Sequence, residues 1–174
     1  RTQIEKGASV IDINMDDGLL VSHDEMEKYL RIVQNDPVVS KVPVMIDSSD
    51  FKTIETALKN IAGKSIVNSI SLKEGEEKFT AKAKIIKKYG AAVVVMAFDE
   101  KGQGVSFERK IEICSRSYKI LKDLGFNAWD IVFDPNILTI GTGSEDDRLN
   151  GINYIRACEW IKNNLKCGGV VGGL

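Results

Sequence analysis

The chain repeats one pattern of hydrophobic and polar positions five times. Each repeat begins with a short run rich in valine and isoleucine, and continues into a longer stretch with apolar residues at helical spacing. The five short runs are Ser9–Met15, Val42–Asp47, Ser65–Ile70, Ala91–Phe98 and Asp130–Phe133. Runs that are brief and apolar at nearly every position are typical of strands buried on both faces, as in parallel sheets covered by helices.

Amphipathic stretches follow the short runs and predict helices. Their apolar stripes are Met26, Tyr29, Leu30 and Val33; Ile54, Leu58 and Ile61; Phe79, Ala83, Ile86 and Tyr89; Ile111, Cys114, Tyr118 and Leu121; and Ile152, Ile155, Cys158, Trp160, Ile161 and Leu165. Two capping boxes, Ser22–Glu25 and Ser71–Glu74, predict the starts of the first and third of these helices. The opening residues Arg1–Lys6 resemble the end of an earlier helix.

Strands and helices therefore alternate along the whole sequence. A final run, Gly168–Leu174, predicts a sixth strand. Strict alternation indicates a parallel sheet, and right-handed crossovers leave two architectures open. One is an open doubly wound sheet and the other is a (β/α)8 barrel. No linker or low-complexity tract divides the sequence, so both architectures predict one domain.

Composition and charge exclude several classes of function. The 174 residues carry 24 Lys and Arg against 25 Asp and Glu, so no basic excess indicates a nucleic acid or an anionic membrane surface as partner. The longest apolar run, Ala91–Phe98, is far shorter than the ~20 residues of a membrane span. Three widely spaced cysteines are unlike a disulfide framework, which favours a cytoplasmic location. The only histidine, His23, falls in a capping box, so no metal site is predicted.

Every predicted strand carries an aspartate or an asparagine at or near its carboxyl end. These residues are Asp12, Asn14, Asp47, Asn68, Asp99, Asp134 and Asn136. In both candidate folds the carboxyl ends of the strands form one rim, where ligands bind. Alternation along a strand puts Asp12 and Asn14 on one face, and likewise Asp134 and Asn136. Because no Lys or Arg is among these residues, the rim is predicted to bind a neutral or cationic ligand rich in N–H donors.

Each of these residues also has a structural alternative, because Asp and Asn are common in turns and helix caps. Ser49 and Asp50 are predicted to be such caps. Five strands that end in the same way nevertheless favour a shared site. The segment Gly141–Gly143 lacks the full spacing of a phosphate loop and is interpreted as a flexible loop. Trp129 and Trp160 are interpreted as packing residues.

Taken together, the strand ends resemble the pterin-binding family. The resemblance is carried by the stretches Val10–Gly18, Val44–Ser49, Ile66–Glu76, Val94–Glu100 and Ile131–Asn136. The stretch Ser65–Gly102 is similar to the folate-binding barrel of cobalamin-dependent methionine synthases in particular. The wider family also includes dihydropteroate synthases and corrinoid methyltransferases. The resemblance extends from Gln3 to about Gly169.

The resemblance implies the fold and its extent. It implies an α/β fold, a (β/α)8 TIM barrel of the dihydropteroate synthase type, with residues 1–174 forming one pterin-binding domain. The family's glycine-glutamate-arginine first strand has no counterpart here. The segment Cys167–Leu174 begins like the family's Gly-Gly-Val-Ser-Asn segment and then departs from it. The domain is therefore expected to be an incomplete barrel of about strands 2–7, without the last βα units, whose open edges would permit self-association.

The resemblance also implies a function. The domain would bind 5-methyltetrahydrofolate and transfer its methyl group to cob(I)alamin on a separate cobalamin-binding domain; zinc would belong only to a separate homocysteine domain. By resemblance the catalytic residues are Asp47, Asn68 and Asp134, and the pterin-binding residues are these three with Asp12, Asn14, Asp99 and Asn136. Two alternatives remain open: a methyltetrahydrofolate corrinoid-protein methyltransferase, and a non-catalytic pterin-binding fragment that is inactive in isolation. A dihydropteroate synthase is disfavoured, because no basic residue at these strand ends marks a pyrophosphate pocket.

Overall fold

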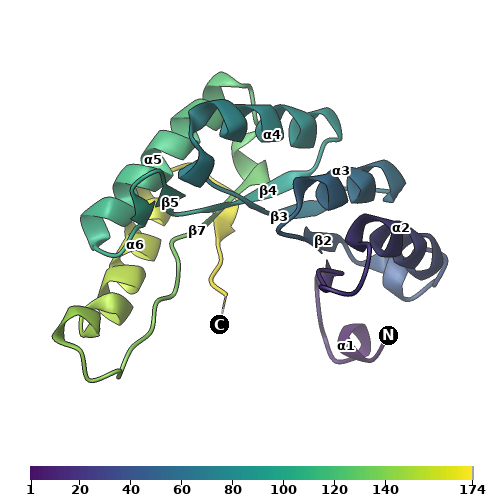
Figure 1. Cartoon of the computed structure of the whole chain (residues 1–174), viewed down its shortest axis with the longest axis horizontal. Coiled ribbons are helices and arrows are strands. Elements are labelled where there is room, and N and C mark those ends of the chain that lie inside the picture. The colour runs from purple at the N-terminus through teal and green to yellow at the C-terminus, as the bar shows by residue number, and fades with distance from the viewer. Residues whose placement is uncertain (174) are drawn as a thin grey trace. The chain divides into compact units, whose positions relative to one another are not determined.

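A six-stranded sheet organises the chain (Figure 1). The computed structural model describes residues 1–173, so Leu174, the last residue of the predicted sixth strand, lies outside the described residues. The strands, in the order in which they lie in the sheet, are β1 (Ile11–Asn14), β2 (Val44–Asp47), β3 (Ile66–Ile70), β4 (Ala92–Met96), β7 (Ile131–Asp134) and β8 (Gly169–Val170). The pairs β1–β2, β2–β3 and β7–β8 are parallel. The predicted α/β fold with a parallel sheet is confirmed.

Helices follow the strands as the amphipathic stretches predict. They are α1 (Thr2–Glu5), α2 (Ser22–Val33), α3 (Phe51–Asn60), α4 (Glu76–Lys88), α5 (Phe107–Asp123) and α6 (Asn150–Asn164). Short 3-10 turns lie at η1 (Val39–Lys41), η2 (Leu72–Glu74), η3 (Ala128–Asp130) and η4 (Glu145–Asp147). Within residues 1–173, none of the helices has the length and apolar character that crossing a membrane requires.

One hairpin was not predicted. The apolar run predicts a single strand over Ala91–Phe98, whereas β4 ends at Met96 and Phe98 begins the antiparallel pair β5 (Phe98–Asp99) and β6 (Gly102–Gln103). The backbone N of Gly104 donates to the carbonyl of Ala97 at 2.8 Å and closes the hairpin. The hairpin displaces Asp99 from the end of the long strand into a separate element.

Both predicted capping boxes are wrong. Helix α2 begins at Ser22 itself, with Val21 in the N-cap position, and among the described side chains none caps it. Ser71 precedes the 3-10 turn η2, where the described residues likewise provide no side-chain cap. Gly75, with φ 90°, then separates this turn from α4, a conformation that glycine adopts readily and other residues rarely. The polar residues before α4 therefore form a turn outside the helix.

The predicted cap at Asp50 is confirmed, and two other structural interpretations are wrong. The Asp50 side chain accepts a hydrogen bond from Lys52 N at the start of α3. Ser49 is not a cap, because its hydroxyl donates to Asp16 instead. Trp129 is 76% exposed, since it lies in the η3 turn, where its backbone N is held by the Asn127 side chain.

The chain divides into two compact units. The first comprises residues 1–69 and 85–93, and the second comprises residues 70–84 and 94–174. In the first unit α2 lies beside α3, and α3 contacts β2 (Figure 1); Met26, Leu30, Ile46 and Ile54 form its buried core. In the second unit α5 lies beside α6, and α6 contacts β8; its buried core includes Phe79, Ile113, Leu121, Phe133 and Ile161.

Candidate functional site

Parallel pairing brings three of the predicted site residues into one row in the first unit. In the register of β1 and β2, Asn14 is opposite Asp47, and in the register of β2 and β3, Asp47 is opposite Asn68. Neighbouring strands lie about 4.8 Å apart, so the row spans about 10 Å. The row of one carboxylate between two carboxamides therefore has the width of a flat bicyclic ring.

Asp12 joins this row from the same face of β1. Asp12 and Asn14 are exposed while Ile13 between them is buried, which confirms the predicted alternation. Asn14 Nδ2 donates to Asp47 Oδ2 at 3.1 Å. Burial raises the pKa of Asp12, the nearby Asp47 carboxylate raises it further, and a hydrogen bond with Asn68 lowers it, with a net rise. Two carboxylates thus lie close enough to repel one another, a state that a ligand with N–H donors relieves.

A second cluster fixes the loops on either side of this row, and sequence reasoning missed it. Asp16 Oδ1 accepts from Ser48 Oγ at 2.6 Å, and Asp16 Oδ2 accepts from Ser49 N and Oγ at 2.7 and 2.8 Å. The backbone N of Asp16 donates to Asn14 Oδ1 at 2.7 Å. Burial raises the pKa of Asp16, but the hydrogen bonds from Ser48 and Ser49 outweigh it and hold that pKa below its usual value. The loop after β1 is therefore tied to the loop after β2, next to Asp47.

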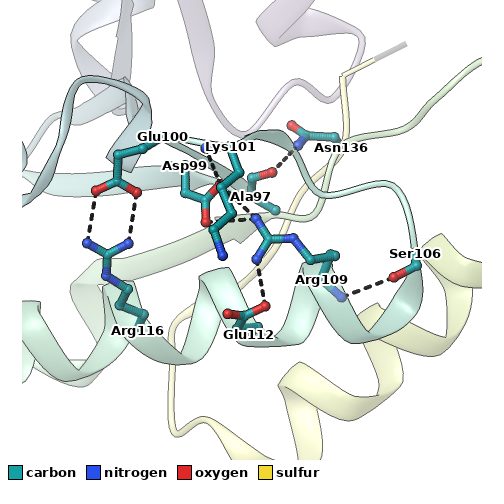
Figure 2. Close-up of polar contacts among 9 residues, drawn as sticks. All are labelled: Ala97, Asp99, Glu100, Lys101, Ser106, Arg109, Glu112, Arg116 and Asn136. Carbon is teal, nitrogen blue, oxygen red and sulfur yellow. Dashed lines mark hydrogen bonds and ion pairs between the residues drawn. The ribbon is translucent and has the colours of Figure 1, made fainter.

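In the second unit Asp99 is engaged by an ion pair with α5. Arg109 Nη2 donates to the two Asp99 oxygens at 2.7 and 2.8 Å (Figure 2), and Lys101 N donates to Oδ1 at 3.0 Å. At the next position Glu100 accepts two bonds of 2.9 Å from Arg116. The hairpin is therefore tied to α5 at two adjacent residues, and the assignment of Asp99 to a ligand stays a prediction.

The end of β7 forms a tight turn around Asp134 and Asn136. Asn136 N donates to Asp134 Oδ1 at 2.8 Å, and Asn136 Nδ2 donates to the carbonyl of Ala97 at 2.7 Å (Figure 2). Asn136 has φ 58°, in the left-handed region that asparagine tolerates better than most residues. The predicted alternation of Asp134 and Asn136 on one strand face is therefore wrong, because β7 ends at Asp134 and the turn buries Asn136.

A buried lysine holds this turn from α5. Lys110 has no exposed surface, and its Nζ donates to the carbonyls of Pro135 at 2.5 Å and Asn136 at 2.9 Å. Burial raises the pKa of Asp134; the hydrogen bond from Asn136 N and the charge of Lys110 lower it, but by less than burial raises it. The interpretation of these strand ends as lacking basic neighbours is thus wrong in the second unit, because α5 supplies Arg109 and Lys110.

The sequence did contain a signal for Lys110. The residues of α5 that are buried are Lys110, Ile113, Cys114, Ser117 and Leu121, which follow helical spacing. A lysine inside an apolar stripe is unusual, because lysine is almost never fully buried unless it is paired. The stripe that the sequence analysis predicts for this helix begins one residue later, at Ile111, and therefore omits Lys110.

The described contacts assign no ligand-binding role to the remaining candidates, the Gly141–Gly143 loop and His23. Gly141 and Gly143 have φ 70° and 84°, and between them Thr142 Oγ1 donates to Asp147 Oδ2 at 2.6 Å, so the loop closes on itself. His23 Nε2 lies 3.0 Å from Lys52 Nζ near the start of α2. Among the side chains that the structure describes, no group of three or more His, Cys, Asp or Glu residues is placed to hold a metal ion.

Solved structures of dihydropteroate synthases share this fold. The 7,8-dihydropteroate synthase of Vibrio fischeri ES114 matches 99% of this chain and 64% of its own, with a TM-score of 0.68 and 16% identity. The Coxiella burnetii enzyme, in complex with pteroic acid, matches 99% and 62%, with 0.65 and 15%. The Xanthomonas albilineans enzyme, in complex with 7,8-dihydropteroate, matches 99% and 60%, with 0.62 and 13%. The predicted barrel fold of the dihydropteroate synthase type is confirmed, and the chain spans less than two thirds of each of these relatives.

A family-level match covers the sequence as well as the fold. The sequence profile described as "Pterin binding enzyme" matches residues 1–173. The match includes the row of Asn14, Asp47 and Asn68 and the turn at Asp134. The chain belongs to the family of pterin binding enzymes.

Proposed function

We propose that this chain binds 5-methyltetrahydrofolate and donates its methyl group to cob(I)alamin on a partner domain, the folate half-reaction of methionine synthesis. The observation that carries the proposal is the row Asn14, Asp47 and Asn68 at the carboxyl ends of three paired strands, with Asp12 beside it. The similarity of Ser65–Gly102 to the folate barrel of cobalamin-dependent methionine synthases favours methyl transfer within the pterin-binding family.

The row has the chemistry that a 2-amino-4-oxo pterin requires. The N–H edge of such a ring is guanidine-like, and a carboxylate accepts two parallel hydrogen bonds from it; we assign this contact to Asp47. A carboxamide both donates and accepts, so Asn68 suits the mixed pattern of the neighbouring ring atoms. The resemblance assigns a further hydrogen bond to Asp134. The other proposed pterin contacts are Asp12, Asn14, Asp99 and Asn136.

Methyl transfer requires positive charge on N5 of the folate, because a neutral tertiary amine is a poor leaving group. In the proposed step N5 is protonated, its bond to the methyl group breaks, and the bonding electron pair stays on N5. The electron pair of the new bond is supplied by cob(I)alamin. The carboxylates Asp12 and Asp47 favour positive charge on the bound ring electrostatically, and the row fixes its orientation.

Dihydropteroate synthesis is the second candidate, because the solved relatives above are dihydropteroate synthases, two of them with pteroate ligands. That reaction needs cations for a pyrophosphate. Two basic residues of α5, Arg109 and Lys110, bond groups at the strand ends of the second unit and so already have partners. Arg109 bonds Asp99 and Glu112, and Lys110 bonds two backbone carbonyls. The described contacts therefore favour a folate that brings no pyrophosphate.

Two assays separate these functions. In the first, calorimetry measures 5-methyltetrahydrofolate affinity for the chain, for Asp47→Ala and Asn68→Ala, and for Asp24→Asn, a control on the exposed side of α2. We expect the first two variants to lose affinity and the control to keep it. Affinity that is absent, or unchanged by Asp47→Ala, would contradict a pterin site at this row.

The second assay follows the chemistry. Methyl transfer to added reduced cobalamin is recorded from its absorbance, beside formation of dihydropteroate from a dihydropterin pyrophosphate and 4-aminobenzoate. Transfer to cobalamin supports the proposed reaction. Dihydropteroate formation would replace it with the second candidate, and folate binding without either reaction would identify a non-catalytic pterin-binding chain.

A further inference from the structure

Lys110 carries a charge into the interior of the second unit, and the hydrogen bonds described for its Nζ go to backbone carbonyls, not to a carboxylate. Its side chain has no exposed surface, and an unpaired buried ammonium is strongly unfavourable. Two of its three donors are satisfied by the carbonyls of Pro135 and Asn136. The lysine is therefore held by the backbone of one turn, the turn that follows β7.

Several hydrogen bonds hold that turn in place, and Lys110 donates two of them. Ala97 N donates to the carbonyl of Asp134 at 2.8 Å, and Asn136 Nδ2 donates back to the carbonyl of Ala97 at 2.7 Å. Asn136 N donates to the Asp134 carboxylate. Lys110 Nζ donates hydrogen bonds to the next two carbonyls, those of Pro135 and Asn136. The direction of the Asp134 side chain is thereby coupled to a residue on α5.

The groups that act on Asp134 come from three elements. Helix α5 contributes Lys110 and Cys114, α6 contributes Tyr154 and Cys158, and the chain after β8 contributes the backbone N of Gly173. Burial raises the pKa of both thiols and raises the pKa of Tyr154 to about 12, so these three groups are neutral at pH 7. Lys110 is the member of this set that brings a positive charge.

We propose that Lys110 is a positioning residue for Asp134, which fixes the turn that carries this side chain and supplies the charge that keeps its carboxylate ionised as an acceptor for the pterin. The contact between Asp134 and the pterin rests on the proposed function. The hold of Lys110 on Asp134 does not, and can be measured without any ligand.

Loss of the Lys110 charge changes the pKa of Asp134 in a definite direction. Burial already favours the protonated form of Asp134, and Lys110 opposes it. Without this charge the pKa of Asp134 rises further, and a protonated Asp134 can no longer act as the carboxylate acceptor of the hydrogen bond that we assign to it from the pterin. Folate affinity would then fall away at a higher pH than in the unaltered protein.

The titration of Asp134 tests this directly. The side-chain carboxyl carbons of aspartate are followed by NMR as a function of pH, and Asp134→Asn identifies the signal. Lys110→Met removes the charge and both hydrogen bonds, Lys110→Gln removes the charge but keeps a donor, and Lys119→Met is the control on the exposed side of α5. We expect the Asp134 midpoint to rise by about one pH unit in both Lys110 variants, and to stay unchanged in the control.

The inference can be tested even if the Lys110 variants fail to fold. The electrostatic coupling is reciprocal, so the titration of Lys110 can be followed when Asp134 is changed instead. The Asp134 charge raises the pKa of Lys110 against burial, which lowers it. In Asp134→Asn, the Lys110 ammonium signal should therefore titrate at a lower pH than in the unaltered chain. An unchanged Lys110 midpoint in that variant, or an unchanged Asp134 midpoint in a folded Lys110→Gln chain, would overturn the inference.

Folate affinity measured from pH 5 to pH 8 then connects the pair to the site. We expect the acid limb of affinity in Lys110→Gln to move to higher pH by the same amount as the Asp134 midpoint, and the limb of the control to stay in place. An acid limb that stays in place while the midpoint moves would overturn the role of Lys110 in pterin binding. If the unaltered chain binds no folate at all, the proposed function fails, and the titrations still decide whether Lys110 controls Asp134.

Discussion

Arg109 Nη2 donates to both carboxylate oxygens of Asp99, at 2.7 and 2.8 Å. The Asp99 side chain is 7% exposed and that of Arg109 is 28% exposed, so water screens this ion pair only in part. Asp47 ends strand β2 in the first unit, and its side chain accepts a hydrogen bond from a neutral amide, that of Asn14. Two aspartates that look equivalent in the sequence therefore differ in the structure. Asp99 forms an ion pair that stabilises the fold, whereas Asp47 is bonded by a neutral amide.

We expect Asp99→Ala to destabilise the chain by about 2–3 kcal/mol, because the half-buried Arg109 would lose its paired contact with Asp99 and keep only the bond to the more exposed Glu112. Urea unfolding measures the effect. The double variant Asp99→Ala with Arg109→Ala should be less destabilised than the sum of the single changes. Arg148→Ala breaks an exposed pair with Glu145 and should change stability by under about 0.5 kcal/mol. Equal effects for the two pairs would contradict a structural role of Asp99.

The Asn14–Asp47 contact predicts a graded loss of folate affinity. Asp47→Asn removes the carboxylate that we assign to the pterin edge, and should weaken binding about 5- to 150-fold, the equivalent of ~1–3 kcal/mol. Asn14→Ala removes the amide that orients Asp47 and should weaken binding less, about 2- to 10-fold. Calorimetry on the two variants and on the double variant measures both effects. Because Asn14 acts through Asp47 in part, the double variant should lose less than the product; a loss equal to the product would show that the two residues act independently.

The loop cluster around Asp16 predicts a pH dependence of stability. The pKa of Asp16 in the folded chain lies below its usual value of 3.8. Its contribution to stability is therefore complete above that value, and is lost as the pH falls through the lower folded pKa. We expect Asp16→Asn to cost about 1 kcal/mol at pH 7, a modest figure because Asp16 is exposed to solvent.

Urea unfolding at pH 7, 5 and 3 checks this prediction. The difference between the unaltered chain and Asp16→Asn should be the same at pH 7 and pH 5 and smaller at pH 3. Asp24→Asn, on α2, serves as a control for the loss of one exposed carboxylate. A difference that disappears already between pH 7 and pH 5 would mean that another group is responsible.

The sequence was sufficient to predict the row in the first unit because it depends on local rules. Parallel strands of similar length bring their carboxyl ends together, and alternation along β1 puts Asp12 and Asn14 on one face. Asp16 was missed because its partners, Ser48 and Ser49, are more than 30 positions away. Side-chain hydrogen bonds between loops depend on how the chain folds in three dimensions, and they produce no periodic pattern in the sequence.

In the second unit, local rules failed at three points. Asp99 lies in the β5–β6 hairpin and not in β4. A continuous apolar run gives no sign of such a short antiparallel pair, so the sequence predicts one strand. A residue with positive φ ended the alternation at Asn136. The predicted stripe of this helix begins at Ile111 and omits Lys110, although the spacing of α5 places Lys110 in the buried stripe. Each failure occurs where a polar group is satisfied by a residue distant in sequence.

The same buried stripe contains a hydroxyl that offers a final prediction. Ser117 is fully buried, and within the described residues its Oγ has no hydrogen-bond partner. A buried hydroxyl without a partner costs about 1–3 kcal/mol, and alanine also has a higher helix propensity by roughly 0.5 kcal/mol. We therefore expect Ser117→Ala to stabilise the chain by about 1 kcal/mol and to raise Tm by about 2–4 °C, with folate affinity unchanged. Ser115→Ala on the same helix loses a bond to the carbonyl of Ile111 and should bring no gain. A lower Tm for Ser117→Ala would show instead that this hydroxyl is satisfied in solution, and that the α5 stripe tolerates polar groups only when each has a partner.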